Sequence, residues 1–225
     1  MNLLDIQPLN LLEKETKFGK LCFLVALNRR EAFLGSLLNI FSLKRIEMKI
    51  ILVRHGESIA NSKGISQGNQ DEWEDTNLTE KGFKQARGVA ERLREEPIDL
   101  IFSSDLKRAK QTAEEINKFH NVPIQLEPNL RDMTNNEDLE KFILKCKEVF
   151  KKIEELNKNV LVVAHGSSCL TLLAITTGNR EEGGKLVRQH SENYGNTCVS
   201  LVEKEGDKYK IKFVGCGKHL DGFSS

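Results

Sequence analysis

The sequence is nearly without net charge, has no long apolar run and contains no C-x-x-C pair, and each absence excludes a class of protein. Lys and Arg number 34 against 33 Asp and Glu, so the formal net charge is +1. This balance provides no overall field that would hold nucleic acid or an anionic membrane. No apolar run approaches the roughly 20 residues that span a bilayer. We therefore expect no nucleic-acid partner and no membrane span, and any anion-binding site is expected to be local.

The cysteines are odd in number and widely separated: Cys22, Cys146, Cys169, Cys198 and Cys216. This pattern argues against a disulfide framework and against a structural zinc site. The apolar stretch Leu21–Leu27 follows acidic residues and has no cleavage site after it, so we expect no signal peptide. These features together predict a cytoplasmic protein with reduced thiols. A chain of 225 residues, 39% of them apolar, can bury a core without cross-links.

The chain changes character at Met48, where an alternation of apolar and amphipathic segments begins. Residues 48–225 are expected to form the catalytic domain. Residues 1–47 are interpreted as an N-terminal extension that is poorly ordered, or as the result of a start codon assigned too early, because Met48 directly precedes the first predicted strand. Apolar residues between Leu34 and Phe41 recur at helical spacing among basic residues, which leaves open a helix lying on a membrane surface or a partner.

Short, nearly continuous apolar runs predict strands that are buried on both faces of a parallel sheet. These strands are expected at Lys49–Val53, Leu100–Ser103, Pro123–Leu126 and Val160–Ala164. Apolar spacing of three and four predicts helices at Thr79–Glu95, Asp105–Phe119 and Glu137–Leu156. A hairpin is expected from Thr197–Glu203 and Tyr209–Val214, and a loop at Glu181–Gly184. This alternation predicts an α/β fold, a three-layer α/β/α sandwich with a mostly parallel sheet.

Polar residues suited to phosphate chemistry directly follow the first predicted strand. In a parallel sheet, ligands bind beyond the carboxyl ends of the strands, which is where Arg54, His55 and Gly56 emerge. Arg54 offers a planar fork of donors, Asn61 adds a neutral donor, and Gly56 is expected to let the backbone approach a ligand. His55 is a candidate nucleophile, because a neighbouring cation lowers the pKa of an imidazole and keeps its attacking nitrogen neutral.

Two further strand ends carry residues of the same kind. Arg108 follows Leu100–Ser103 in the first turn of a predicted helix, where backbone N–H groups and the helix dipole favour an anion. His165 and Gly166 follow Val160–Ala164, again ahead of a predicted helix. Each residue alone could be structural. Three strand ends that all deliver Arg or His instead predict one pocket for a dianionic, tetrahedral group.

Together these motifs resemble the histidine phosphatase superfamily, also called the phosphoglycerate mutase-like family. The resemblance covers nearly all of residues 48–220 and rests on five ordered motifs, Leu52–Ser58, Asp75–Gly82, Ser103–Ala109, Val162–Gly166 and His219–Leu220. It implies a phosphoglycerate mutase-like fold and the transient phosphorylation of His55. Because the sequence contains no metal-ligand cluster, guanidinium and imidazole donors are expected to meet the developing charge, without metal or cofactor.

The resemblance also implies roles for the remaining site residues. Arg54, Arg108 and His165 are expected to hold the transferring phosphoryl group, and Asn61 and the backbone of Gly166 are expected to assist. Gln67 falls, together with the glycine that follows it, where the family places a pair of residues that contact the substrate. A small phosphorylated substrate is therefore the expected partner, while the oligomeric state is not predicted.

The general acid is expected to be Asp132. Family members usually carry a glutamate in a Leu-x-Glu segment, whereas this chain has Leu130–Arg131–Asp132, which shortens the side chain by one methylene. Aspartate can serve if its loop brings it within hydrogen-bond reach. If Asp132 is instead a loop or capping residue, then Glu57, Glu137 or Asp138 could substitute. Alternatively, a substrate with a good leaving group, such as phosphohistidine or an acyl phosphate, would need little acid.

The sequence thus predicts a phosphomonoester hydrolase that acts through phosphohistidine on a small phosphorylated metabolite or a phosphoprotein. One alternative is phosphoglycerate mutase-type phosphoryl transfer, which requires a closed, strongly basic pocket; the loop after Asp132 has no obvious basic insert. The other alternative is a non-catalytic module that binds phosphorylated ligands. The altered segment around Asp132 mildly favours that alternative, and the presence of both His55 and His165 argues against it.

Overall fold

The computed structural model describes residues 47–65 and 75–221, which belong to the compact unit Ile46–Ser225. The strands in these ranges are β1 Met48–Arg54, β2 Leu100–Ser103, β3 Ile124–Leu126, β4 Val160–Ala164, β5 Val199–Glu205 and β6 Lys208–Cys216. The α-helices are α2 Ile59–Ser62, α3 Glu80–Leu93, α4 Lys107–His120, α5 Leu139–Leu156, α6 Gly166–Thr176 and α7 Arg180–His190. Two 3-10 helices are η2 Pro128–Leu130 and η3 Lys218–Leu220.

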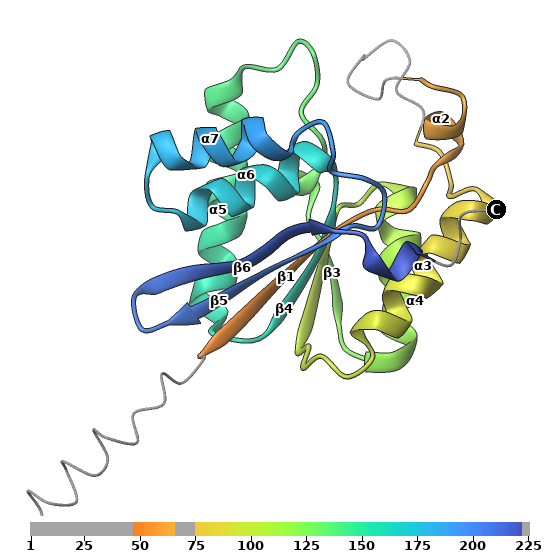
Figure 1. The fold of residues 1–225 in the computed structure, drawn as a ribbon, viewed down its shortest axis with the longest axis horizontal. Helices are drawn as coiled ribbons and strands as arrows, with labels where there is room; N and C mark the ends of the chain where they lie inside the picture. Colours follow the sequence, from red (N-terminus) through yellow and green to blue (C-terminus); the bar gives the residue numbers. More distant parts are fainter. Residues whose placement is uncertain (1–46, 66–74, 222–225) are drawn as a thin grey trace, which may run out of the picture. The chain divides into compact units, whose positions relative to one another are not determined.

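The strands form one sheet in the order β3-β2-β4-β1-β5-β6 (Figure 1). Strands β1, β2, β3 and β4 run parallel to one another, with Leu52 of β1 opposite Val162 of β4. The hairpin of β5 and β6 is antiparallel and joins the sheet through pairing of β5 with β1. The prediction of a mostly parallel sheet with a hairpin at one side is confirmed.

Helices cover both faces of the sheet (Figure 1). Ile51 and Val53 of β1 pack in a cluster with α3 and α4, whereas Ile50 and Leu52 pack in another cluster with α5 and α6. Alternate residues of one strand therefore face opposite layers, as the period of a β-strand requires. This arrangement confirms the three-layer α/β/α sandwich, and it leaves the carboxyl ends of the parallel strands at one edge.

The segment expected to be a loop at Glu181–Gly184 is instead part of α7, so that prediction is wrong. Asn179 caps this helix, because its side chain accepts hydrogen bonds from the backbone of Glu181 and Glu182. Gly183 suits a close helix contact, since a methyl group there would lie 2.9 Å from the carbonyl oxygen of Ala174 in α6. Paired glycines indicate a loop in sequence, but here Gly183 allows two helices to approach.

Two further expectations concern the N-terminal extension and the absence of a membrane-spanning helix. Residues 1–46 lie outside the described residues, and with them nearly all of the expected N-terminal extension. Within the ranges that the structure describes, no helix has both the length and the apolar character needed to cross a membrane.

Candidate active site

The centre of the candidate site is a buried contact between two histidines and an arginine from three strand ends. His55 follows β1, Arg108 lies in the first turn of α4 after β2, and His165 follows β4. Their exposed fractions are 2%, 1% and 0%. The two imidazole rings meet edge to face with 5.0 Å between centroids. The sheet order, in which β4 lies between β1 and β2, brings these three residues together.

The hydrogen bonds define which nitrogen of His55 is unprotonated and can act as the nucleophile. Arg108 can only donate, and its Nε lies 3.3 Å from Nε2 of His55, so this nitrogen is the acceptor. Nδ1 of His55 then carries the proton and donates it to the carbonyl oxygen of Gly56 at 2.7 Å. His55 is therefore neutral, and the lone pair on Nε2 points towards a guanidinium group.

His165 takes the opposite tautomer. Its Nδ1 accepts from Nη2 of Arg108 at 3.3 Å, so its Nε2 carries the proton and donates to Oγ of Ser104 at 3.0 Å. Ser104 is fully buried directly after β2. The sequence motif contained this serine, but nothing in its position showed that it would orient a histidine from another strand.

Burial and positive charge keep both imidazoles neutral. Burial is the largest cause that lowers the pKa of His55, and the charges of Arg108 and Arg54 lower it further. The pKa of His165 is lowered by burial first, then by His55 and Arg108. Burial also lowers the pKa of Arg108 to about 10, which leaves this guanidinium cationic near neutral pH. The site thus combines neutral nucleophilic nitrogens with fixed cationic donors.

Arg54 is the last residue of β1, beside His55, and one of its N–H donors has no hydrogen-bond partner among the described residues. Its Nη1 donates to the carbonyl oxygen of Tyr194, and its Nε is buried without a hydrogen-bond partner among the described residues. Buried donors in native proteins are normally satisfied, so an unpaired one in a cluster of cations is a candidate contact for an anion. Tyr194 was not predicted, because it lies 140 residues away in the segment between α7 and β5.

The segment between α7 and β5 also holds the backbone of His55. Nδ2 of Asn196 donates to the carbonyl oxygen of His55 at 3.0 Å and to Oδ1 of Asn61 at 3.4 Å. The backbone N–H of Thr197 contacts the carbonyl oxygens of Arg54 and His55 at 3.0 and 3.2 Å. Asn61 also closes a capping box with Ser58 at the start of α2. Its amide oxygen is thus used by the scaffold, and its NH₂ group is the part available to a ligand.

Gly56 has a different role from the expected one. A methyl group at this position would lie 2.6 Å from the carbonyl oxygen of Gly82 in α3, so the glycine allows contact with a helix rather than with a ligand. Glu57, an alternative acid, is engaged at the same helix end, where it accepts from Oγ1 of Thr79 at 2.8 Å and pairs with Lys81 at 3.0 Å. These contacts fix the loop after β1 against α3.

Asp132 lies in the loop between η2 and α5, next to the start of α6. Its Oδ1 accepts hydrogen bonds from the backbone N–H of Ser167, at 3.2 Å, and from the hydroxyl of the same residue. The alternative acids are used elsewhere, because Glu137 pairs with Lys145 and Asp138 caps α5. Of the carboxylates considered for the acid, Asp132 is the one held beside the helix that follows His165.

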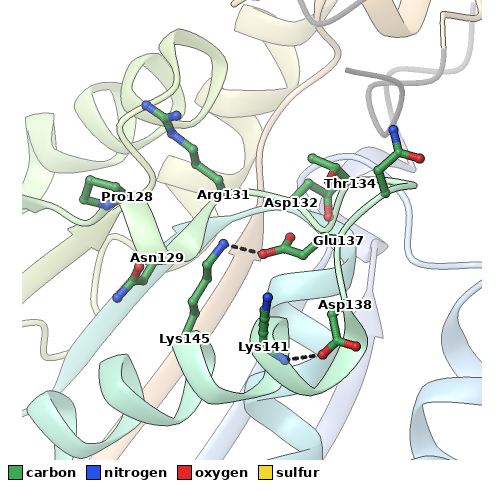
Figure 2. Close-up of a pocket in the computed structure, with 10 residues that line it drawn as sticks. Pro128, Asn129, Arg131, Asp132, Thr134, Glu137, Asp138, Lys141 and Lys145 are labelled. Atoms are coloured by element: carbon green, nitrogen blue, oxygen red, sulfur yellow. Dashed lines mark hydrogen bonds and ion pairs between the residues drawn. The ribbon is translucent and has the colours of Figure 1, made fainter. Parts of the chain in front are cut away.

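A polar hollow of about 540 Å³ adjoins Asp132. Figure 2 shows it between η2, the loop after Asp132 and the first turns of α5, with the side chains of Lys145 and Glu137 meeting inside it. Its lining also includes Arg131 and Lys141, and it contains no aromatic side chain. Arg131 is already held by Asp105, with 2.8 Å between Nε and Oδ1. The hollow therefore presents charges of both signs, largely paired with one another.

Two predicted residues remain. Gly166 begins α6, and a methyl group there would meet no atom of the rest of the protein within 4 Å, so the space beside its Cα is open. Gln67 lies outside the described residues, as does the rest of 66–74. Among residues 47–65 and 75–221, no group of three or more His, Cys, Asp or Glu side chains gathers as a metal site would require.

Comparison with known proteins identifies the class of enzyme. The sequence model of the histidine phosphatase superfamily (branch 1) matches residues 50–137. An uncharacterized phosphatase, PhoE of Bacillus subtilis, is 31% identical over 198 residues, which cover 77% of this chain and 97% of the relative. Putative phosphoserine phosphatase 2 of Hydrogenobacter thermophilus is 26% identical over 200 residues, covering 74% and 94%.

Solved structures agree with this relationship at the level of the fold. Phosphoglycerate mutase from Bacillus anthracis superposes with a TM-score of 0.63 at 20% identity, covering 77% of this chain and 95% of that structure. The fold is thus phosphoglycerate mutase-like. The chain belongs to the histidine phosphatase superfamily, as its motifs predicted, and it is an enzyme of the phosphatase type.

Proposed function

We propose that this protein is a phosphomonoester hydrolase in which Nε2 of His55 accepts the phosphoryl group. The observation that carries the proposal is the tautomer of His55: Nδ1 donates its proton to the carbonyl oxygen of Gly56, which leaves Nε2 unprotonated beside Arg108 in a buried site. The buried, unpartnered Nε of Arg54 supplies a further donor for an anion. A neutral nucleophile surrounded by fixed cations suits attack on a dianionic phosphorus centre.

The first half of the reaction transfers phosphorus to the enzyme. Nε2 of His55 attacks in line, the new N–P bond forms, and the P–O bond to the leaving group breaks with its electron pair moving to oxygen. Asp132, protonated at this stage, gives its proton to that oxygen. Arg54 and Arg108 meet the charge on the equatorial oxygens, and the N–H of Gly166 and the NH₂ of Asn61 add neutral donors.

The second half releases phosphate. Water attacks phosphorus and passes a proton to the Asp132 carboxylate, while the N–P bond breaks and returns its electron pair to Nε2. His165 has its lone pair towards Arg108 and thereby orients the guanidinium.

The hollow beside Asp132 supports a small, polar substrate. A leaving oxygen within reach of Asp132 places the rest of the substrate next to this space, whose paired charges and lack of aromatic side chains suit a hydroxylated or zwitterionic group. The relatives named phosphoserine phosphatase and adenosylcobalamin/α-ribazole phosphatase fit a small phosphorylated metabolite. Buried, unpaired thiols at Cys146, Cys169 and Cys198 support a cytoplasmic location.

Hydrolysis is favoured over mutase chemistry by the charge of this hollow. A mutase has to retain a phosphorylated intermediate while it reorients, which calls for a strongly basic enclosure. Here Lys145 pairs with Glu137, and Arg131 pairs with Asp105. Asp132 does not favour the binding-module alternative, because its carboxylate is held by Ser167 in the first turn of α6, the helix that follows His165.

Trapping of the phosphoenzyme tests the proposal. The wild type and His55→Ala are incubated with ³²P-labelled phosphoester in the presence of EDTA, quenched in alkali and mapped. Label on His55 and full activity with EDTA are expected; label on another residue, or none during turnover, would exclude the mechanism.

Asp132→Asn should lower turnover of alkyl phosphates by about 10²–10⁴-fold and that of p-nitrophenyl phosphate much less. Glu137→Gln is the matched control. It should leave the ratio of the two turnover rates, alkyl phosphate against p-nitrophenyl phosphate, at its wild-type value.

A further inference from the structure

We propose that Ser167 is a positioning residue for the general acid, an inference that rests on the proposed function. Nothing in its sequence position, one residue after Gly166, marks it as part of the chemistry. Its hydroxyl and its backbone N–H both donate to the same oxygen, Oδ1 of Asp132. Two donors from one rigid residue determine both where this carboxyl group lies and which of its oxygens faces outwards.

The hydroxyl of Ser167 has no freedom to turn elsewhere. A hydroxyl has one proton to donate, and here Oγ also accepts a hydrogen bond from the backbone N–H of Met133 at 3.0 Å. The residue after the acid thus fixes the serine rotamer, and the serine fixes the acid. This closed set of contacts ties the loop to α6 at the side chain of Asp132 itself.

Ser168, the next residue of α6, binds the same loop through the loop's backbone. Oγ of Ser168 lies 2.9 Å from the carbonyl oxygens of both Leu130 and Arg131. Ser168 therefore holds the backbone before Asp132 but does not touch its carboxylate. Because α6 begins directly after His165, the two serines set the distance between the acid loop and the phosphoryl site.

This arrangement compensates for the shorter acid. Aspartate has one methylene less than the glutamate usual in the family, so it reaches less far and needs a more exact anchor. With Oδ1 occupied by Ser167, Oδ2 accepts no hydrogen bond from the described residues. Oδ2 is thus the oxygen that can carry the proton to the leaving group and take one from water.

The test is the dependence of kcat/KM on the leaving group. Ser167→Ala is expected to lower turnover of phosphoserine or glycerol phosphate by about tenfold to a hundredfold, the effect of losing a hydrogen bond to a charged group. Turnover of p-nitrophenyl phosphate, whose leaving group needs little acid, should fall less than about threefold. Ser167→Thr, which keeps the hydroxyl, should retain most of the wild-type turnover of phosphoserine or glycerol phosphate.

Ser168→Ala is the matched control, because it loosens the loop without touching the carboxylate. It should discriminate between the two classes of substrate much less than Ser167→Ala does. Equal losses on both classes in Ser167→Ala, or no loss, would overturn the positioning role. If wild-type enzyme forms phosphohistidine and Asp132→Asn discriminates between leaving groups while Ser167→Ala does not, only this inference fails. If no phosphohistidine forms, the proposed function fails, and this inference fails with it.

Discussion

The backbones of Gly56 and Gly82 are in direct contact. A methyl group on Gly56 would lie 2.6 Å from the carbonyl oxygen of Gly82, and one on Gly82 would lie 2.0 Å from the carbonyl oxygen of Glu57. The backbone N–H of Thr79, the residue that caps α3, donates to this same oxygen of Glu57 at 2.9 Å. The end of α3 thus supports the loop that carries His55, and no side chain fits between them.

Gly82→Ala is therefore expected to destabilise the protein although it lies in a helix. Alanine normally stabilises a helix by about 0.5–1 kcal/mol relative to glycine, but here the backbone has to move, at a cost of about 1–3 kcal/mol. The control is Gly184→Ala in α7, whose added methyl meets only the mobile end of Arg188, at 3.3 Å. Urea unfolding should show a loss for the first variant and a small gain for the second; a gain for both would refute the contact.

Gly166→Ala is expected to separate stability from phosphate binding. Apart from its chain neighbours and its own helix, no atom lies within 4 Å of the added methyl, so the free energy of unfolding should change by less than about 0.5 kcal/mol. The methyl would occupy the open space beside Gly166 at the start of the helix, next to the N–H group that is proposed to bind a phosphoryl oxygen. Inhibition by inorganic phosphate should weaken by about tenfold, the equivalent of one lost hydrogen bond. An unchanged inhibition constant would remove Gly166 from the proposed site.

The convergence of Arg54, His55, Arg108 and His165 could be predicted from sequence for a simple reason. Each lies at, or within a few residues of, the carboxyl end of a parallel strand, and parallel strands deliver these ends to one edge of the sheet. The core strands could be found because their apolar runs are nearly continuous, and β4 is indeed buried at every position. Local chemistry and a general rule of topology were sufficient here.

Other features could not be predicted, because they depend on contacts between distant segments. Asn196 lies 141 residues from His55, in a segment without a motif, and only the folded chain shows that it holds the carbonyl of the nucleophile. Ser167 and Asp132 are 35 residues apart and meet through a loop of irregular conformation. Gly56 was expected to face a ligand, since sequence shows that a glycine allows close approach but not what approaches.

Arg108→Met is expected to raise the pKa of His55. Burial, the largest cause of the lowered pKa, remains in this variant, but the charge of Arg108 is lost, so the pKa should move towards the ordinary value of about 6.5 without reaching it. NMR titration of the His55 ring measures the change. Arg180→Met removes a guanidinium that is 86% exposed and pairs with Glu140, and should leave the titration unaltered. A His55 titration identical in Arg108→Met and wild type would contradict the assigned contact.

His219→Gln is expected to reduce the loss of stability in acid. Nδ1 of His219 accepts from Arg92 at 3.1 Å, its Nε2 donates to Oγ1 of Thr197 at 3.1 Å, and burial, reinforced by the charge of Arg92, lowers its pKa to about 4. Between about pH 6.5 and 4 the unfolded chain therefore binds a proton at this histidine that the folded chain does not, so stability falls as the pH falls.

One such proton corresponds to a slope of about 1.4 kcal/mol per pH unit in the free energy of unfolding. Urea titrations between pH 6.5 and 5 should give a slope that is smaller in His219→Gln than in wild type by up to this amount, whatever the difference in stability at neutral pH. His55 and His165 contribute slopes of the same sign, because their pKa values are lowered as well, so the variant should retain part of the dependence. Identical slopes in the two proteins would show that His219 protonates as readily in the folded chain as in the unfolded one, and the bond from Arg92 to Nδ1 could then not be present.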